Sequence, residues 1–158
     1  AKKRLVHVDH LMLYRPLFAA GATVTLRTDS KPLRDYALGQ FAAAGYDTLW
    51  KSDDVRRDHP EHPETEYECR TREMGAAVYG ICATPGAQPT DEQLTVGRMQ
   101  EQSLACYLPD NLDELTYVPL GMEEAVENFR NRARKGKKRL PQESQGPLMV
   151  AASANKRK

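Results

Sequence analysis

Residues 21–45 constrain the fold more than any other stretch, because a strand pattern there leads directly into a helix pattern. Residues 22–28 alternate apolar and polar side chains, which predicts a half-buried strand. Residues 30–44 carry apolar side chains at helical spacing, and Asp29 or Ser30 can cap the helix. The chain is therefore predicted to form a domain that mixes helices and strands.

The remaining patterns extend this pair into a longer order of elements. Further strands are predicted at 46–52, 65–71 and 103–109, and a second helix at 90–102 begins with a threonine followed by acids. Residues 74–83 are apolar and small, and fit either a helix or a strand. The order βαββαβ predicts an α+β fold, a ferredoxin-like sandwich.

The segments on either side of this predicted sandwich define three parts of the chain. We predict an N-terminal strand or arm over 1–20 and a single ferredoxin-like domain over 21–135, which includes a helix at 122–135. A basic and polar tail is predicted over 136–158.

Composition excludes several classes of protein. Charged residues make up 28% of the chain and the formal net charge is +1, so no global charge marks a nucleic-acid coat or a membrane binder. No apolar stretch approaches the roughly 20 residues that a membrane span needs, and no signal peptide is apparent. The three cysteines include no CxxC pair, which argues against a disulfide framework or structural zinc. A cytoplasmic protein without a membrane partner is expected.

A basic cluster lies at the end of the last predicted helix. It fits a solvated helix end, or a surface that contacts nucleic acid or an acidic partner through charge. Aromatic side chains are almost absent there, so base stacking is not indicated. Its members are Arg130, Arg132, Arg134, Lys135, Lys137, Lys138 and Arg139.

The sequence gives little indication of a metal site, a nucleotide-binding site or a hydrolase site. His59 and His62 stand beside Glu61 and Glu64, but the intervening prolines and the lack of further ligands favour a solvated loop, so no metal is predicted. Motifs for binding nucleoside triphosphates or dinucleotides, and the α/β-hydrolase motif, are absent.

The junction between the second predicted helix and the last predicted strand carries a family resemblance. It has a Leu-x-Val-x-Arg pattern at 94–98, a Glu-Gln pair at 101–102 and an aromatic end at Tyr107. An acidic segment, PETEYEC, opens the third predicted strand. Over 22–109, these features and the element order resemble the phage-encoded S-adenosylmethionine lyases, formerly called hydrolases.

The resemblance implies a ferredoxin-like homotrimer that binds S-adenosylmethionine between its subunits. The substrate's carboxylate would attack its own γ-carbon, so that methylthioadenosine leaves and homoserine lactone forms without a cofactor or metal. The protein would mainly hold the reacting atoms in position. Such a bacteriophage enzyme would counter host restriction-modification in the host cytoplasm.

The resemblance also implies residue roles. The implied catalytic residues are Glu66, Glu68 and Gln102. The carboxylate of Glu66 or Glu68 would bind the substrate's ammonium group, and the amide of Gln102 would orient the substrate. Tyrosines would pack on the adenine. The implied substrate-binding residues are Tyr46, Tyr67, Glu64 and Glu101.

Plainer interpretations of these residues remain open. Glu101 and Gln102 also fit the polar end of a helix, and the alternating glutamates of 64–68 also fit a solvated strand face. The alternative function is a non-enzymatic phage or bacterial accessory protein, which would bind nucleic acid or a protein complex through its basic C-terminal segment. A third is a regulatory module that binds a nucleotide without converting it.

Overall fold

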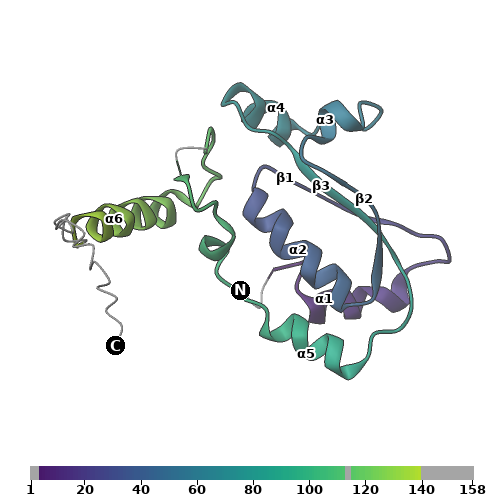
Figure 1. The fold of residues 1–158 in the computed structure, drawn as a ribbon. Helices are drawn as coiled ribbons and strands as arrows, with labels where there is room; N and C mark the ends of the chain where they lie inside the picture. The colour runs from purple at the N-terminus through teal and green to yellow at the C-terminus, as the bar shows by residue number, and fades with distance from the viewer. Residues whose placement is uncertain (1–3, 113–114, 140–158) are drawn as a thin grey trace, which may run out of the picture.

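The computed structural model describes residues 4–112 and 115–139, with side chains described as far as Arg132. The chain combines helices with an antiparallel sheet, so the α+β class is confirmed (Figure 1). The elements in order are α1 (Val8–Tyr14), η1 (Arg15–Leu17), β1 (Val24–Thr28), α2 (Lys31–Ala43), β2 (Tyr46–Ser52), α3 (Val55–Asp58), α4 (Glu66–Glu73), β3 (Tyr79–Pro85), α5 (Asp91–Met99), η2 (Leu104–Tyr107) and α6 (Glu123–Arg139).

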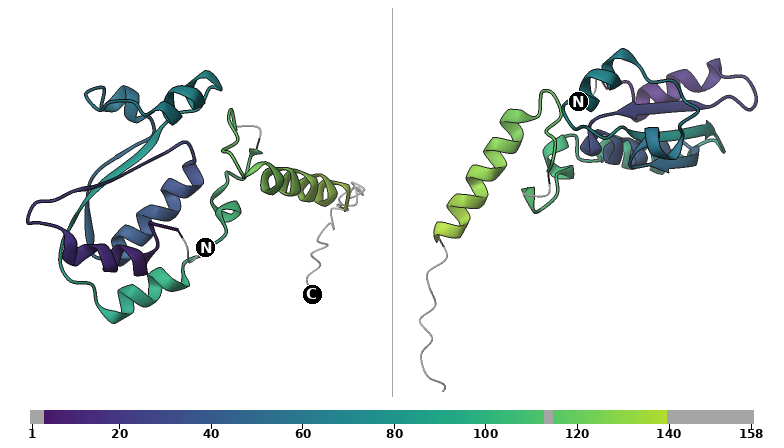
Figure 2. Two further views of the ribbon diagram at one scale, coloured as in Figure 1. Left: turned by 180° about the vertical axis from the view of Figure 1, so that it is seen from behind. Right: turned by 90° about the horizontal axis from the view of Figure 1, so that it is seen from above.

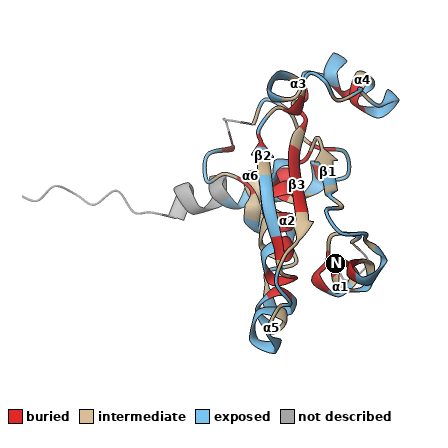
Figure 3. Cartoon of the chain, turned by 90° about the vertical axis from the view of Figure 1, so that its right-hand side faces the viewer, coloured by how far each residue is buried: buried red, intermediate tan, exposed pale blue. Residues whose placement is uncertain are grey.

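The described residues form a three-stranded sheet in the order β1-β3-β2. The central strand β3 runs antiparallel to both neighbours, with Leu26 of β1 opposite Ile81. A bulge between Thr48 and Trp50 shifts the register of β2. Burial is concentrated on β3, as Figure 3 shows, because this strand has a neighbour on each side and helices against one face.

The main core lies between the sheet and helices α1, α2 and α5. Phe41 of α2 is fully buried and packs edge-on against Tyr46 of β2, with ring centroids 5.5 Å apart. Val8 and Leu11 bring α1 into the same cluster. A second, smaller cluster joins η2 to the start of α6, and α6 then extends away from the sheet (Figure 2).

The strand–helix–strand unit at the centre of the sequence is confirmed. Ser30 is the N-cap of α2, and its hydroxyl accepts a hydrogen bond from the backbone N–H of Leu33 at 3.2 Å. Gly45 follows the helix with a φ of 69°, a left-handed conformation that glycine adopts without steric cost. Local signals therefore mark both ends of this helix, and Arg15 also donates to the backbone oxygens of Ala44 and Gly45 at its C-terminal end.

Two of the four predicted strands are wrong. Residues 65–71 begin a helix, α4, because Thr65 and Glu68 form a capping box and the acids precede the bases along the helix axis. Residues 103–109 contain the 3₁₀-helix η2 instead of a strand. The ferredoxin-like βαββαβ order is therefore not confirmed.

Other helices and strands also begin or end at residues that differ from those predicted. The predicted N-terminal strand or arm contains helix α1, which begins after His7. The ambiguous segment 74–83 becomes strand β3 from Tyr79 onward. Helix α5 is confirmed but ends at Met99, and α6 continues to Arg139, beyond the predicted start of the tail.

Among the described residues, no helix is both long enough and apolar enough to cross a membrane.

Gly97 allows α5 to approach its neighbours closely. A Cβ at this position would lie 2.7 Å from the Cβ of Ala43 and 3.1 Å from that of Val8. We expect Gly97→Ala to destabilise the protein by about 1 kcal/mol or more, although alanine is the better helix former. Urea unfolding of this variant and of the exposed control Val96→Ala measures the difference. A more stable Gly97→Ala variant would contradict the close packing.

Candidate functional site

The best-defined polar site lies where β1 ends and α2 begins. Asp29 occupies this junction, and its Oδ2 accepts hydrogen bonds from the hydroxyl of Tyr117 at 2.7 Å and from that of Tyr67 at 3.1 Å. Tyr67 lies on α4, and Tyr117 lies in the segment between η2 and α6. Three segments distant in sequence therefore meet at one half-buried carboxylate.

A pocket of about 240 Å³ lies beside this carboxylate. Its walls are mostly apolar and aromatic, and include Tyr79, Tyr107 and Leu108. Lys31 and Asp29 are the charged residues among the described residues that line it. An apolar pocket with a few convergent polar groups is the usual form of a small-molecule binding site.

Both tyrosines are held in the protonated, donating form. Burial raises the pKa of Tyr117 well above its ordinary value, and the hydrogen bond to the Asp29 carboxylate raises it further. Burial and the same carboxylate also raise the pKa of Tyr67. The hydroxyls therefore remain hydrogen-bond donors to Asp29 at neutral pH.

The titration of Tyr117 tests this contact. We expect Asp29→Asn to lower the Tyr117 pKa toward the ordinary tyrosine value, because the acceptor loses its charge. In the parent protein, the raised pKa contributes stability below the ordinary tyrosine pKa, and this is lost as pH rises through the folded-state value. Ring resonances of Tyr117 followed by NMR at alkaline pH measure the shift. Asp47→Asn serves as the control, and an equal pKa in both variants would refute the contact.

An ion pair fastens α4 to β1 and so places Tyr67. Arg27 Nη2 lies 2.5 Å from Glu68 Oε2, and Arg27 Nη1 donates to the backbone oxygen of Pro63 at 2.9 Å. The same Glu68 oxygen accepts the backbone N–H of Thr65 at 2.9 Å. Glu68 is 6% exposed, so its carboxylate is largely shielded from water, whereas the bond from Arg27 to Pro63 is exposed.

The other residues assigned near the third predicted strand have structural partners. Glu66 is exposed and pairs with Arg70 one turn along α4. Glu64 lies 2.7 Å from Arg72. Tyr46 is buried, and its hydroxyl donates to the backbone oxygen of Leu11 at 2.8 Å.

The predicted Glu-Gln pair follows the end of α5. Glu101 accepts the backbone N–H of Ser103 at 2.7 Å, which stabilises the turn. Gln102 Oε1 accepts the hydroxyl of Tyr36 at 3.0 Å. Among the described residues, Gln102 and Glu68 have different hydrogen-bond partners, and no hydrogen bond joins these two side chains. No observation tests a catalytic role for either residue.

The basic cluster falls on α6. Arg132 is exposed and Arg130 is half-buried. The remaining members share the helical backbone of α6, but their side chains lie outside the described part of the chain: Arg134, Lys135, Lys137, Lys138 and Arg139.

The sequence interpretation missed Asp29 and Tyr117 as site residues. Asp29 was considered only as a helix cap, although it is a carboxylate that directly follows a predicted strand. That position was the one available signal. Tyr117 carries no recognisable local pattern.

Comparison with known proteins finds two methyltransferases that are similar to part of this chain. No protein-family model matches the chain. A tRNA (guanine-N(7)-)-methyltransferase of Streptococcus equi subsp. zooepidemicus is 29% identical over 85 residues, 52% of this chain and 40% of that protein. The enzyme of the same name from Brevibacillus brevis is 29% identical over 86 residues, 53% of this chain and 40% of its own. The chain thus spans about 40% of the length of these curated relatives.

These relatives overturn the lyase interpretation. They are methyltransferases, so the resemblance to phage S-adenosylmethionine lyases is wrong, and with it the predicted anti-restriction function. The predicted homotrimer rested on that resemblance and has no support. The alternative, a non-enzymatic accessory protein, gains no support from these relatives either.

Proposed function

We propose that this chain contributes the guanine-binding part of a methyltransferase that acts on tRNA. The observation that carries the proposal is its similarity to two tRNA (guanine-N(7)-)-methyltransferases over about half of the chain. The site at Asp29 supplies the chemistry that such a substrate requires.

A carboxylate suits guanine because the N1–H and the N2 amino group are adjacent donors on one edge of the base. Enzymes that modify a base read this edge after taking the base out of its stack. The N7 atom lies on the opposite side of the purine and remains accessible. Asp29 would therefore hold the base while leaving its reacting atom free.

The reaction needs no general base. The N7 lone pair forms a bond to the methyl carbon as the bond between that carbon and a sulfonium donor breaks, and no proton leaves. The purine gains a positive charge, which a nearby carboxylate stabilises electrostatically.

Tyr67 and Tyr117 would position the carboxylate. Both hydroxyls donate to Oδ2 of Asp29. In the proposed complex, Oδ1 would accept the hydrogen bond from the base. The pocket of about 240 Å³ is smaller than the roughly 300–1,000 Å³ typical of drug-sized ligands, which suits a single base. Tyr79 and Tyr107 in its walls offer aromatic contact.

Contacts to the tRNA backbone would come from the basic cluster. Arg130 and Arg132 lie on α6, which extends from the body of the protein (Figure 2). Arginines on such a helix neutralise phosphates without reading sequence. An enzyme that acts on tRNA would work where tRNA is present, so the expected cytoplasmic location stays part of this proposal.

Guanine binding can be tested on this chain directly. We would titrate guanosine 5′-monophosphate into the protein and follow the Tyr67 and Tyr117 resonances by NMR, with adenosine 5′-monophosphate as the control. Selective shifts by the guanine nucleotide support the proposal. Equal shifts by both nucleotides, or none near Asp29, overturn it. Formation of 7-methylguanosine in tRNA from labelled S-adenosylmethionine tests the full activity.

A further inference from the structure

The loop between α3 and α4 gathers three side chains that commonly bind metals. His59 is the C-cap of α3, and its backbone oxygen accepts the N–H of His62 at 3.1 Å. This closes a four-residue turn with Pro60 at its second position, where proline is favoured. The proline that argued against a metal site in the sequence therefore builds the turn that brings the side chains together.

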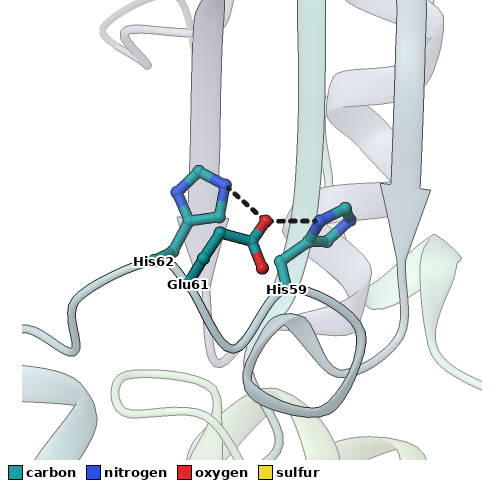
Figure 4. A group of neighbouring side chains, drawn as sticks. All are labelled: His59, Glu61 and His62. Atoms are coloured by element: carbon teal, nitrogen blue, oxygen red, sulfur yellow. Dashed lines mark hydrogen bonds and ion pairs between the residues drawn. The ribbon is translucent and has the colours of Figure 1, made fainter.

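The three side chains converge on one carboxylate oxygen (Figure 4). Glu61 Oε1 lies 3.3 Å from His59 Nδ1 and 3.7 Å from His62 Nε2. One candidate ligand atom from each residue lies within 4.8 Å of the others. Ligands of a tetrahedral zinc ion are about 3.3 Å apart when each bond is about 2.0–2.1 Å long, so small side-chain rotations would complete the geometry.

Trp50 fixes one of the ligands in place. The indole stacks on the His59 imidazole with ring centroids 4.2 Å apart and an interplanar angle of 29°. The His62 ring lies 6.0 Å from the same indole. A stacked imidazole loses less side-chain freedom on binding a metal, which lowers the entropic cost of forming the site.

The neighbouring Arg57 does not occupy the Glu61 carboxylate, which can therefore bind a metal ion. Arg57, the nearest arginine in sequence, donates to Asp58 at 2.8 Å, so its charge is already compensated. Glu61 itself is largely exposed, so an ion can approach from solvent.

We propose that His59, Glu61 and His62 bind a first-row divalent transition metal of the zinc type, with the remaining coordination positions open to water. Two imidazoles and a carboxylate select such ions over magnesium or calcium, which prefer oxygen ligands. The ion would cross-link the loop that precedes α4. The site is separate from Asp29 and does not depend on the proposed function.

The single tryptophan of the chain provides the readout. Paramagnetic Co²⁺ bound at His59 would quench Trp50 fluorescence, so titration with Co²⁺ is expected to give saturable quenching at one ion per chain. Zn²⁺ should compete with Co²⁺, and EDTA should restore the fluorescence.

Two variants and a matched control decide the assignment. His62→Ala and Glu61→Gln keep the Trp50–His59 stack, and each is expected to weaken Co²⁺ binding at least tenfold. His10→Ala removes a histidine outside the cluster and should bind as the parent protein does. Circular dichroism confirms that each variant is folded. Non-saturable quenching, or equal affinity in His62→Ala and His10→Ala, would overturn the proposal.

Discussion

Asp29→Asn is expected to weaken binding of guanosine 5′-monophosphate by about 10- to 150-fold. Hydrogen bonds to a charged acceptor contribute about 1.5–3 kcal/mol, and each 1.4 kcal/mol corresponds to a factor of ten. Asparagine keeps the size of the side chain, but its amide nitrogen would face the donors of the guanine edge. Calorimetry on the parent protein and the variant measures the change.

Matched variants separate this effect from general disturbance of the site. Tyr117→Phe removes the 2.7 Å hydrogen bond to Asp29 but leaves the carboxylate, so a smaller loss of affinity is expected. Asp47→Asn changes an exposed carboxylate on β2 and should leave binding unchanged. Parent-like affinity in folded Asp29→Asn would remove Asp29 from the proposed site.

Glu68→Ala is expected to lower the free energy of unfolding by about 3–5 kcal/mol. Removing one partner of a buried ion pair leaves the other charge uncompensated, and that cost lies in this range. Glu68 is 6% exposed and bonds both Arg27 and the backbone of Thr65, so the capping box of α4 is lost as well. Urea unfolding measures the loss.

The neighbouring glutamate gives the control. Glu66 and its partner Arg70 are exposed, with side-chain exposures of 80% and 71%. Exposed pairs spaced one turn apart in a helix contribute about 0.3–0.5 kcal/mol, so Glu66→Ala should change stability little. Similar losses in the two variants would mean that the Arg27–Glu68 pair does not anchor α4.

The segment that carries Glu66 and Glu68 could not be assigned to a helix or a strand from local patterns. Alternating polar and apolar side chains in 65–71 fit a strand, yet the Thr65–Glu68 spacing also fits a helix cap. Local patterns did not choose between them. The choice also depends on Arg27 of β1, which is 41 residues from Glu68 in sequence and pairs with it only in the folded chain.

The predicted role of Gln102 beside Glu68 shows the same limit. This role depended on a predicted strand at 65–71. The segment is a helix in the structure, and the two side chains have different partners there. Site residues predicted from adjacent strands are correct only if those strands are predicted correctly, because a helix in place of a strand brings different side chains close together.

The sequence by itself determined β1, α2 and β2. Alternation, helical spacing, the Ser30 cap and Gly45 are local signals, and each acts within a few residues. Only the tertiary structure decided the site at Asp29. Its partners Tyr67 and Tyr117 lie 38 and 88 residues away in sequence, and no local pattern encodes a contact that forms when separate segments pack together.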